Sequence, residues 1–126
     1  MSISTLGIIG SGQLGSLLCQ AAKKLKIKTV VISDDEQGPA QNHADEFIYS
    51  KYDNKDKIEE FKSKVDVVTY EFENIPLNIL KEIDSKIKVY PKPDINQIIQ
   101  NRKLEKAFVN SLGIKTTNWA FIRSTD

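Results

Sequence analysis

Three glycines near the start of the chain have the spacing of a phosphate-binding turn. Gly10, Gly12 and Gly15 lie in the segment Gly-Ser-Gly-Gln-Leu-Gly, after a short apolar run and before a helical pattern. Glycines at such a turn allow a tight bend and let a ligand approach the backbone, while free N–H groups at the start of the helix face the anion. The same pattern also fits a tight turn that binds nothing, so the glycines alone leave both interpretations open.

Acidic residues follow at the position where an enzyme that uses NAD would need them. Asp34 and Asp35 end the next apolar run, roughly 20 residues after Gly15, where a carboxylate can accept hydrogen bonds from a ribose. We therefore keep two alternative hypotheses for the glycine turn: the NAD-binding domain of an oxidoreductase, and a nucleotide-binding module without catalytic activity.

A second cluster combines two carboxylates with two aromatic rings in residues 70–74, which read Tyr-Glu-Phe-Glu-Asn. Ligands of open α/β sheets bind beyond the carboxyl ends of the strands, so this cluster and the glycine turn are expected to share one crevice. Glu71 and Glu73 are able to accept hydrogen bonds from a cationic or amino-bearing substrate in a partly dry pocket. In the alternative interpretation, Tyr70 and Phe72 face inward and both carboxylates are solvated.

Arg102 is the third candidate, because its planar guanidinium suits a phosphate or a carboxylate. On a helix as charged as residues 100–106, a solvated or ion-paired arginine is the alternative. We assign His43 and Cys19 to structure, since His43 has no catalytic partner nearby in the sequence and Cys19 lies among apolar helical residues. The sequence shows no metal-binding cluster and no nucleophile accompanied by a base.

The elements that must position these residues alternate between strand and helix up to about residue 113, which predicts an α/β fold with a parallel sheet flanked by helices. Predicted strands cover residues 6–9, 29–32, 47–49, 65–69 and 87–90. Predicted helices cover residues 14–25, 53–64, 76–83 and 94–112, the last as one or two helices.

Three local patterns refine these elements. Apolar residues at helical spacing mark one face of the first helix: Leu14, Leu17, Leu18, Ala21, Ala22 and Leu25. Asp94, with Gln97 three residues later, resembles a capping box at the start of a helix. Residues 119–122 predict one more strand near the end of the chain.

The composition limits the class of protein. The 126 residues are 40% hydrophobic and 28% charged with a formal net charge of +1, which indicates a globular protein and gives no electrostatic reason to expect nucleic acid. No apolar run approaches the ~18 residues of a membrane-spanning helix, and the first residues lack a signal-peptide pattern. We therefore expect a cytoplasmic protein without a membrane partner. A single cysteine excludes an internal disulfide.

Four segments together resemble one family. They are residues 12–15, 70–76, 90–93 and 101–106, which read Gly-Gln-Leu-Gly, Tyr-Glu-Phe-Glu-Asn-Ile-Pro, Tyr-Pro-Lys-Pro and Asn-Arg-Lys-Leu-Glu-Lys. In this order they are similar to the 5-(carboxyamino)imidazole ribonucleotide synthetases of purine biosynthesis, which are ATP-grasp enzymes. The chain departs from the family pattern at Ser11, where glycine is frequent, and at Ser16, where many relatives have arginine.

The resemblance implies three parts. Residues 1–93 would form a Rossmann-like pre-ATP-grasp domain that binds the substrate, residues 94–113 would form linking helices, and residues 114–126 would open an ATP-grasp domain with a strand. The chain would then be the N-terminal portion of an ATP-dependent carbon–nitrogen ligase. The family reaction couples ATP, bicarbonate and 5-aminoimidazole ribonucleotide to give the N-carboxylated amine, ADP and phosphate. The resemblance also implies Mg²⁺ as a cofactor and a homodimer.

The resemblance further implies roles for individual residues. Gly12, Gln13 and Leu14 would lie on the phosphoribosyl side of the substrate, with its phosphate against the backbone N–H groups there. Glu73 would accept hydrogen bonds from the ribose or the amine, with Glu71 as a second candidate, and Arg102 would contact ATP phosphates. The central lysine and the Mg²⁺ carboxylates of the family would lie outside this chain, so the 126 residues alone are expected to bind substrate weakly and to hydrolyse no ATP.

Overall fold

A computed structural model describes residues 3–124 and confirms the predicted α/β class. Four strands form one parallel sheet in the order β3-β2-β1-β4. Their bounds are Thr5–Ile9 for β1, Lys28–Ser33 for β2, Glu46–Tyr49 for β3 and Val67–Tyr70 for β4. The helices are α1 (Gln13–Lys24), the short 3₁₀ helix η1 (Pro39–Asn42), α2 (Lys55–Ser63), α3 (Leu77–Asp84), α4 (Pro93–Ile99) and α5 (Arg102–Ser111).

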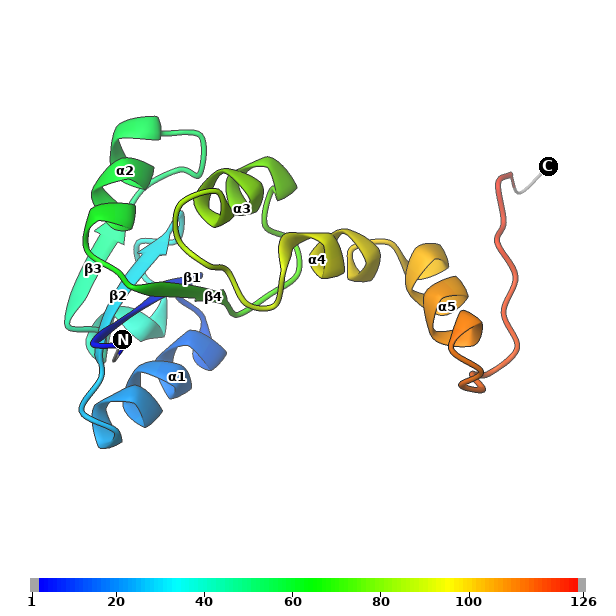
Figure 1. Cartoon of the computed structure of the whole chain (residues 1–126), viewed down its shortest axis with the longest axis horizontal. Coiled ribbons are helices and arrows are strands. Elements are labelled where there is room, and N and C mark those ends of the chain that lie inside the picture. The colour runs from blue at the N-terminus through cyan, green and yellow to red at the C-terminus, as the bar shows by residue number, and fades with distance from the viewer. Residues whose placement is uncertain (1–2, 125–126) are drawn as a thin grey trace.

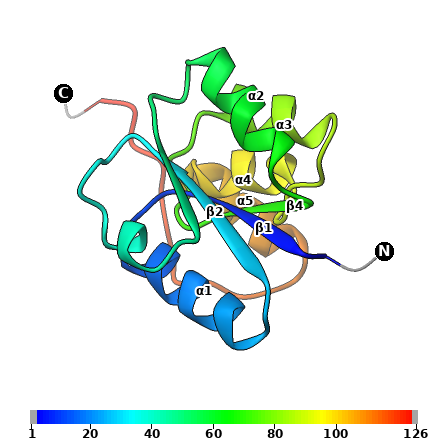
Figure 2. The same cartoon turned by 90° about the vertical axis from the view of Figure 1, so that its left-hand side faces the viewer.

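Helices cover both faces of the sheet, with α1 on one side and α2 and α3 on the other (Figures 1 and 2). Alternate strand residues point to opposite faces, and this separates two buried clusters. The larger cluster, on the side of α2 and α3, includes Ile9, Ile32 and Phe61, all fully buried. The smaller one, on the side of α1, is formed by Ile8, Cys19, Val31 and Ala40.

The predicted fifth strand, residues 87–90, is reduced to a single bridge. Val89 pairs with Val68 of β4, and the N–H of Tyr90 donates to the carbonyl of Val68 at 2.9 Å. Pro91 comes next and has no N–H to extend the ladder, so the predicted strand was wrong in its extent.

The first helix faces the sheet with its small residues, which corrects the apolar face that the spacing indicates. Its buried residues are Gly15, Ser16, Cys19 and Ala22, whereas Leu14 and Leu17 are 60% and 53% exposed. The reason is close packing: a Cβ on Gly15 would lie 2.9 Å from the carbonyl oxygen of Gly10. Only small side chains fit between this helix and the sheet, so the leucines turn toward solvent.

Beyond the sheet, α4 and α5 extend away from the rest of the molecule (Figure 1). Helix α4 begins at Pro93 with Lys92 as its N-cap, and no side chain caps it, so the predicted capping box at Asp94 was wrong. Proline suits the first helical turn because it needs no N–H there. Helix α5 is capped instead by Asn101, whose side-chain oxygen accepts from the N–H groups of Lys103 and Leu104.

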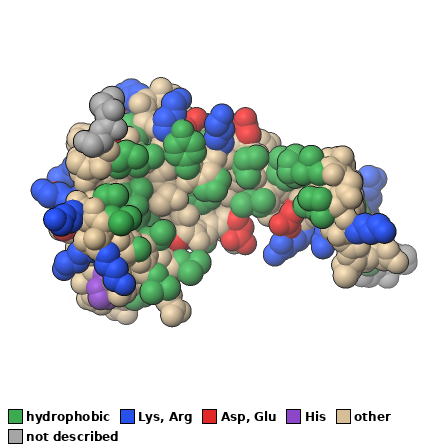
Figure 3. Space-filling model, turned by 60° about the horizontal axis from the view of Figure 1, so that its bottom comes forward, with side chains coloured by type: hydrophobic (Ala, Val, Ile, Leu, Met, Phe, Trp, Pro, Cys, Tyr) green, Lys and Arg blue, Asp and Glu red, His purple; other side chains and the backbone are tan. Residues whose placement is uncertain are grey.

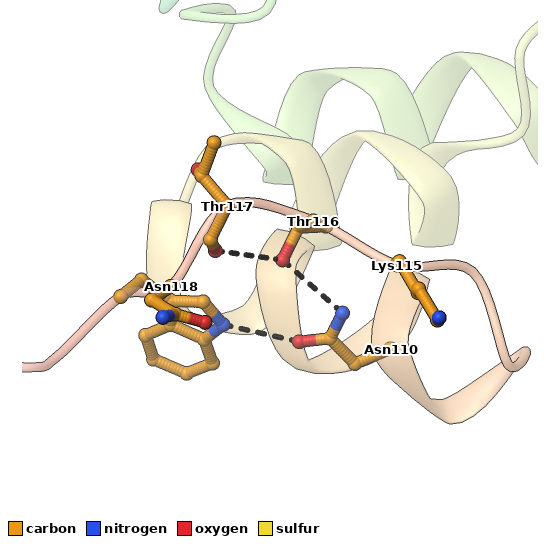
Figure 4. A pocket seen from close by; sticks show the side chains of 6 residues that line it. Asn110, Lys115, Thr116, Thr117 and Asn118 are labelled. Carbon is orange, nitrogen blue, oxygen red and sulfur yellow. Dashed lines mark hydrogen bonds between the residues drawn. The ribbon is translucent and has the colours of Figure 1, made fainter.

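The segment after α5 contains no strand among its described residues, so the strand predicted at residues 119–122 was wrong. A strand needs a neighbour for its backbone hydrogen bonds, and none lies beside this segment. It is held to α5 by side chains instead: the indole N–H of Trp119 donates to Oδ1 of Asn110 at 3.1 Å, and Nδ2 of Asn110 donates to Thr116 at 3.2 Å (Figure 4).

We call residues 3–90 the body and residues 101–124 the arm. Helix α4 joins them and packs on α3 of the body. The arm buries little: α5 has no buried residue, and Trp119, Phe121 and Ile122 are 40%, 54% and 73% exposed, as expected for apolar side chains with little cover. Among residues 3–124, no helix is both long enough and apolar enough to span a membrane.

Candidate substrate-binding site

The glycine turn and the aromatic-acidic cluster meet at one edge of the sheet. Strands β1 and β4 are neighbours, with Ile9 beside Tyr70. The turn that follows β1 and the segment that follows β4 therefore leave the sheet side by side, and the N–H of Glu71 donates to the carbonyl of Ile9 at 3.2 Å. The structure thus brings together the two regions that the sequence singled out.

The carboxylate of Glu71 fills the hollow at the start of α1. Its Oε1 accepts the N–H of Gly12 at 2.6 Å, and its Oε2 accepts the N–H of Gly15 at 2.6 Å. The sequence predicted free N–H groups in this turn, with a substrate phosphate against them. In the structure, a carboxylate of the same chain already accepts the hydrogen bonds of Gly12 and Gly15, so these two N–H groups are not free.

Glycines in the turn make room for Glu71. A Cβ on Gly10 would lie 2.6 Å from Cγ of Glu71, and a Cβ on Gly12 would lie 2.7 Å from its Oε1. Gly10 also has φ +102, a backbone conformation that other residues rarely adopt. The spacing that is typical of a phosphate-binding turn here accommodates a side chain.

Glu73 is exposed at the same edge of the sheet, and its backbone is held by Asn96 of α4 and by Gln100, the residue after this helix. The carbonyl of Glu73 accepts from Nδ2 of Asn96 at 3.1 Å and from Nε2 of Gln100 at 2.6 Å. Gln100 also donates to the carbonyl of Ile75 at 2.7 Å. Sequence reasoning missed these supports, because an amide side chain in a helix carries no sign of the distant carbonyl that it binds.

A groove lies beside this edge, along α1 and the end of β4. It has a volume of about 520 Å³ and is lined by Leu14, Leu17, Leu18, Ala21, Thr69, Tyr70 and Glu71. Figure 3 turns the α1 side of the molecule forward and shows hydrophobic side chains on this face. Gln13 is exposed next to Leu14 at the start of the helix. Two of the predicted substrate residues, Gln13 and Leu14, therefore lie at or beside a groove.

The hydroxyl of Tyr70 is buried and has no hydrogen-bond partner among the described residues, and its side chain belongs to the larger cluster, on the face of the sheet opposite α1. The residue is only 9% exposed. Burial raises the pKa of the Tyr70 hydroxyl. Buried hydroxyls normally find a partner, so the Tyr70 hydroxyl is an exception within the core.

Arg102 lies on the arm, apart from the groove. It is the first residue of α5, its side chain is 81% exposed, and its Nη1 lies 2.6 Å from a carboxylate oxygen of Glu105. This hydrogen bond raises the pKa of Arg102 and keeps the guanidinium charged. The ion-paired alternative from the sequence therefore describes Arg102 in this structure, where it contacts no part of the glycine turn.

The end of β2 is occupied by a loop that folds back on the glycine turn. The N–H of Ala40 donates to the carbonyl of Ser11 at 2.9 Å, and the hydroxyl of Ser11 lies 2.8 Å from that of Ser33 and 3.1 Å from the carbonyl of Asp35. Because these contacts close the space between the glycine turn and the end of β2, they leave little room for a ribose at Asp35.

Cys19 and His43, the other residues considered in the sequence, lie in positions that favour a structural role. Cys19 is 1% exposed, and burial raises the pKa of its thiol, so the less reactive protonated form prevails. His43 is exposed at the end of η1 and is not among the residues that line the groove. Within residues 3–124, no group of three or more His, Cys, Asp or Glu side chains is placed to hold a metal ion.

Comparisons with known proteins agree on one family. The family described as "Ribonucleotide synthetase preATP-grasp domain" matches residues 3–100. The N5-carboxyaminoimidazole ribonucleotide synthase of Brucella melitensis is 37% identical over 119 residues, which are 94% of this chain and 33% of that protein. The chain thus spans about a third of the length of the curated relatives that it matches.

Solved structures give the same result. The N5-carboxyaminoimidazole synthetase of Staphylococcus aureus in complex with ADP is 40% identical with a TM-score of 0.81, over 87% of this chain and 30% of that one. An Aspergillus clavatus N5-carboxyaminoimidazole synthase in complex with ADP and 5-aminoimidazole ribonucleotide is 27% identical with a TM-score of 0.77, over 88% of this chain and 30% of that one.

Proposed function

This chain belongs to the ribonucleotide synthetase preATP-grasp family, and on that basis we propose that it is the N-terminal part of an ATP-dependent carbon–nitrogen ligase. The ligase carboxylates 5-aminoimidazole ribonucleotide with bicarbonate and gives 5-(carboxyamino)imidazole ribonucleotide, ADP and phosphate in purine biosynthesis. The observation that carries this proposal is the 37% identity with an N5-carboxyaminoimidazole ribonucleotide synthase over 94% of the chain.

The contribution of this chain is to bind and orient the ribonucleotide. Bicarbonate is a poor electrophile, and its phosphorylation by ATP gives a carboxyphosphate. The amine attacks the carbonyl carbon of this carboxyphosphate and expels phosphate, or it attacks the carbon dioxide that forms when carboxyphosphate loses phosphate. The amine must then be held still and close to its reaction partner. Glu73 accepts hydrogen bonds from the ribose or the amine, and its exposed side chain on an anchored backbone supports this role.

Three residues of the glycine turn complete the proposed substrate site. Gly12 shapes the turn around Glu71, while Gln13 and Leu14 present their side chains to the sugar side of the ribonucleotide. The groove beside them supports this arrangement, because apolar side chains of α1 line it next to Glu71 and the end of β4.

The nucleotide and the metal depend mostly on residues elsewhere. Arg102 is the residue of this chain that we propose for ATP phosphates, since its charged guanidinium is exposed and, among the described residues, hydrogen-bonds to the neighbouring Glu105. The described residues offer no carboxylate cluster that fits Mg²⁺, so we place the metal ligands outside this chain and derive no step from them. We therefore expect that these 126 residues alone form no ADP.

The division of the chain and its setting are part of the same proposal. Residues 1–93 form the pre-ATP-grasp domain, residues 94–113 link it, and residues 114–126 begin an ATP-grasp region, although the described part of that last segment is not a strand here. We expect a homodimer that acts in the cytoplasm, as the family resemblance implies.

An NAD-binding domain is disfavoured by the site itself. The amides of Gly12 and Gly15 that would hold a pyrophosphate are donated to Glu71. The loop at Asp35 folds onto Ser11, where a ribose would need space. A nucleotide-binding module without catalytic activity predicts an affinity for ligand that does not depend on Glu73, and this separates it from the ligase.

Titration of the chain followed by NMR tests the proposal. 5-Aminoimidazole ribonucleotide is expected to shift resonances of Gln13, Leu14 and Glu73, whereas NADH leaves them unchanged. Glu73→Gln removes a carboxylate that accepts charge-assisted hydrogen bonds and should weaken binding at least about tenfold. Glu36→Gln, an exposed position on the loop after β2, is the matched control. Binding of NADH alone, or unchanged affinity in Glu73→Gln, would overturn the assignment.

A further inference from the structure

The two carboxylates that follow β4 are placed differently. Glu71 turns back onto the glycine turn and accepts the N–H groups of Gly12 and Gly15, whereas the side chain of Glu73 is exposed. The two oxygens of Glu71 are bound by backbone donors at the start of a helix, as two oxygens of a phosphate would be. The chain therefore supplies its own anion at the position where a Rossmann-like domain binds one from solution.

We infer that Glu71 is a specificity-determining residue that keeps phosphate groups out of the glycine turn. The inference rests on the proposed function, because it concerns which groups of the chain bind the phosphate of that ribonucleotide. Its phosphate must be bound by groups other than the amides of Gly12 and Gly15, and a dinucleotide that needs those amides is rejected.

Hydrogen-bond capacity gives the first argument. Each backbone N–H is a single donor, and the donors of Gly12 and Gly15 are taken at 2.6 Å each. A phosphate that approached these amides would have to displace the carboxylate or lie against it. Because both groups are negative, the second arrangement is repulsive in a partly buried turn.

The shape of the glycine turn also leaves no room for a phosphate beside Glu71, independently of charge. Three glycines of the turn surround Glu71 so closely that a Cβ would lie 2.6 Å from its Cγ at Gly10, 2.7 Å from its Oε1 at Gly12 and 3.1 Å from its Oε2 at Gly15. The side chain thus occupies the space that the absence of Cβ atoms leaves free. Its backbone is fixed as well, because the N–H of Glu71 donates to the carbonyl of Ile9.

The arrangement also accounts for the presence of two glutamates, Glu71 and Glu73, in residues 70–74. Glu71 is a positioning residue that ties the end of β4 to the start of α1, so the segment that carries Glu73 leaves the sheet in one fixed direction. Asn96 of α4 and Gln100, the residue after this helix, hold the same segment through the carbonyl of Glu73. The carboxylate of Glu71 is bound within the protein, whereas that of Glu73 remains available to the ribose or the amine.

Two variants of Glu71 test the inference, with inorganic pyrophosphate as the probe and the amide resonances of Gly12 and Gly15 as the readout. In the unaltered chain and in the charge-matched control Glu73→Ala, pyrophosphate should not saturate these resonances. In Glu71→Ala the amides are released, and the apparent affinity for pyrophosphate should rise at least about tenfold. Equal affinity in the unaltered chain and Glu71→Ala, with the variant folded, would overturn the inference.

Hydrogen exchange decides the question where Glu71→Ala fails to fold. Glu71→Gln keeps the shape of the side chain but offers one donor where two acceptors are needed. The amides of Gly12 and Gly15 should exchange at least about tenfold faster in this variant than in the unaltered chain, relative to the amide of Ile9 in the adjoining strand. Unchanged exchange would show that Glu71 does not hold the turn, and the inference would fail.

Titration of the same variants with 5-aminoimidazole ribonucleotide separates this inference from the proposed function. Binding that depends on Glu73 while pyrophosphate binds only Glu71→Ala supports both. Absence of ribonucleotide binding in every folded variant counts against the proposed function, and leaves the contrast in pyrophosphate binding as the measure of Glu71.

Discussion

The body and the arm use the same kinds of residue with opposite results. In the body, apolar side chains meet across the sheet, and Phe61, Leu80 and Ile83 are fully buried. In the arm, α5 has its own periodic apolar residues, yet Leu104 and Phe108 are 46% and 42% exposed. Periodicity therefore predicts a helix, whereas burial needs a second surface, which the described part of the arm does not provide.

The largest expected contrast is between two phenylalanines. Phe61 is fully buried against β1, where a Cβ on Gly7 would lie 2.6 Å from its ring. Phe61→Ala should lower the free energy of unfolding by about 3–5 kcal/mol, because it leaves a cavity in the larger cluster. Phe108→Ala in the arm should change it by less than about 1 kcal/mol. Urea denaturation followed by circular dichroism measures both, and equal losses would erase the contrast.

Two glycines give the next contrast. A Cβ at Gly12 would lie 2.7 Å from Oε1 of Glu71, so Gly12→Ala should destabilise the body by about 1–3 kcal/mol. Gly113 in the arm has open space around it and φ +76, so Gly113→Ala strains only its own turn. Thermal unfolding of the sheet should respond to the first substitution and not to the second. A lower melting temperature in Gly113→Ala would mean that arm and body unfold together.

A pH dependence follows from the edge of the body. Asp66 accepts hydrogen bonds from the N–H and hydroxyl of Ser4 and from the N–H of Thr5, and these bonds lower the pKa of its carboxyl in the folded state. Its contribution to stability is therefore complete above the ordinary aspartate pKa of about 3.9 and is lost as the pH falls through the lowered value.

Asp66→Asn should remove this loss of stability at low pH. The variant is expected to be less stable than the unaltered chain at pH 7, and the difference should vanish in strong acid, where the carboxyl of the unaltered chain is protonated as well. Denaturant titrations at several pH values give the measurement. A constant difference across the whole range would contradict the assignment of the hydrogen bonds to the charged form.

The smallest effect is expected in the arm itself. Trp119 donates one hydrogen bond to Asn110 at 3.1 Å and is 40% exposed. Trp119→Ala should leave the stability of the body unchanged within about 0.5 kcal/mol, while the amide resonances of residues 110–118 shift. Shifts that reach the strands would show that the arm is coupled to the sheet.

The sequence was sufficient for what depends on neighbours along the chain. The alternation of strands and helices, the glycine turn after β1 and the acidic segment after β4 were all predicted from local patterns. Their meeting at one edge of the sheet was expected as well, but the hydrogen bonds from Gly12 and Gly15 to Glu71 were not, because Glu71 lies 59 residues from Gly12 in the sequence. A glycine pattern reports that space is needed at a turn, but not whether a ligand or a side chain fills that space.

Burial was harder to predict than the elements themselves. The spacing of Leu14 and Leu17 is helical, as predicted, but the close approach of α1 to the sheet at Gly15 turns both leucines outward. The strand expected at residues 119–122 failed for a related reason, since a strand forms only where another strand accepts its hydrogen bonds. In both cases the outcome depends on a distant surface that no local pattern encodes.

The position of Trp119 has a practical consequence for optical work. It is the only tryptophan of the chain, and it lies in the arm, near Asn110 and away from both buried clusters. The fluorescence of this tryptophan will therefore report on the arm and will change little while the sheet unfolds. The tyrosines Tyr52 and Tyr70, which are buried in the body, are the chromophores that sense the fold.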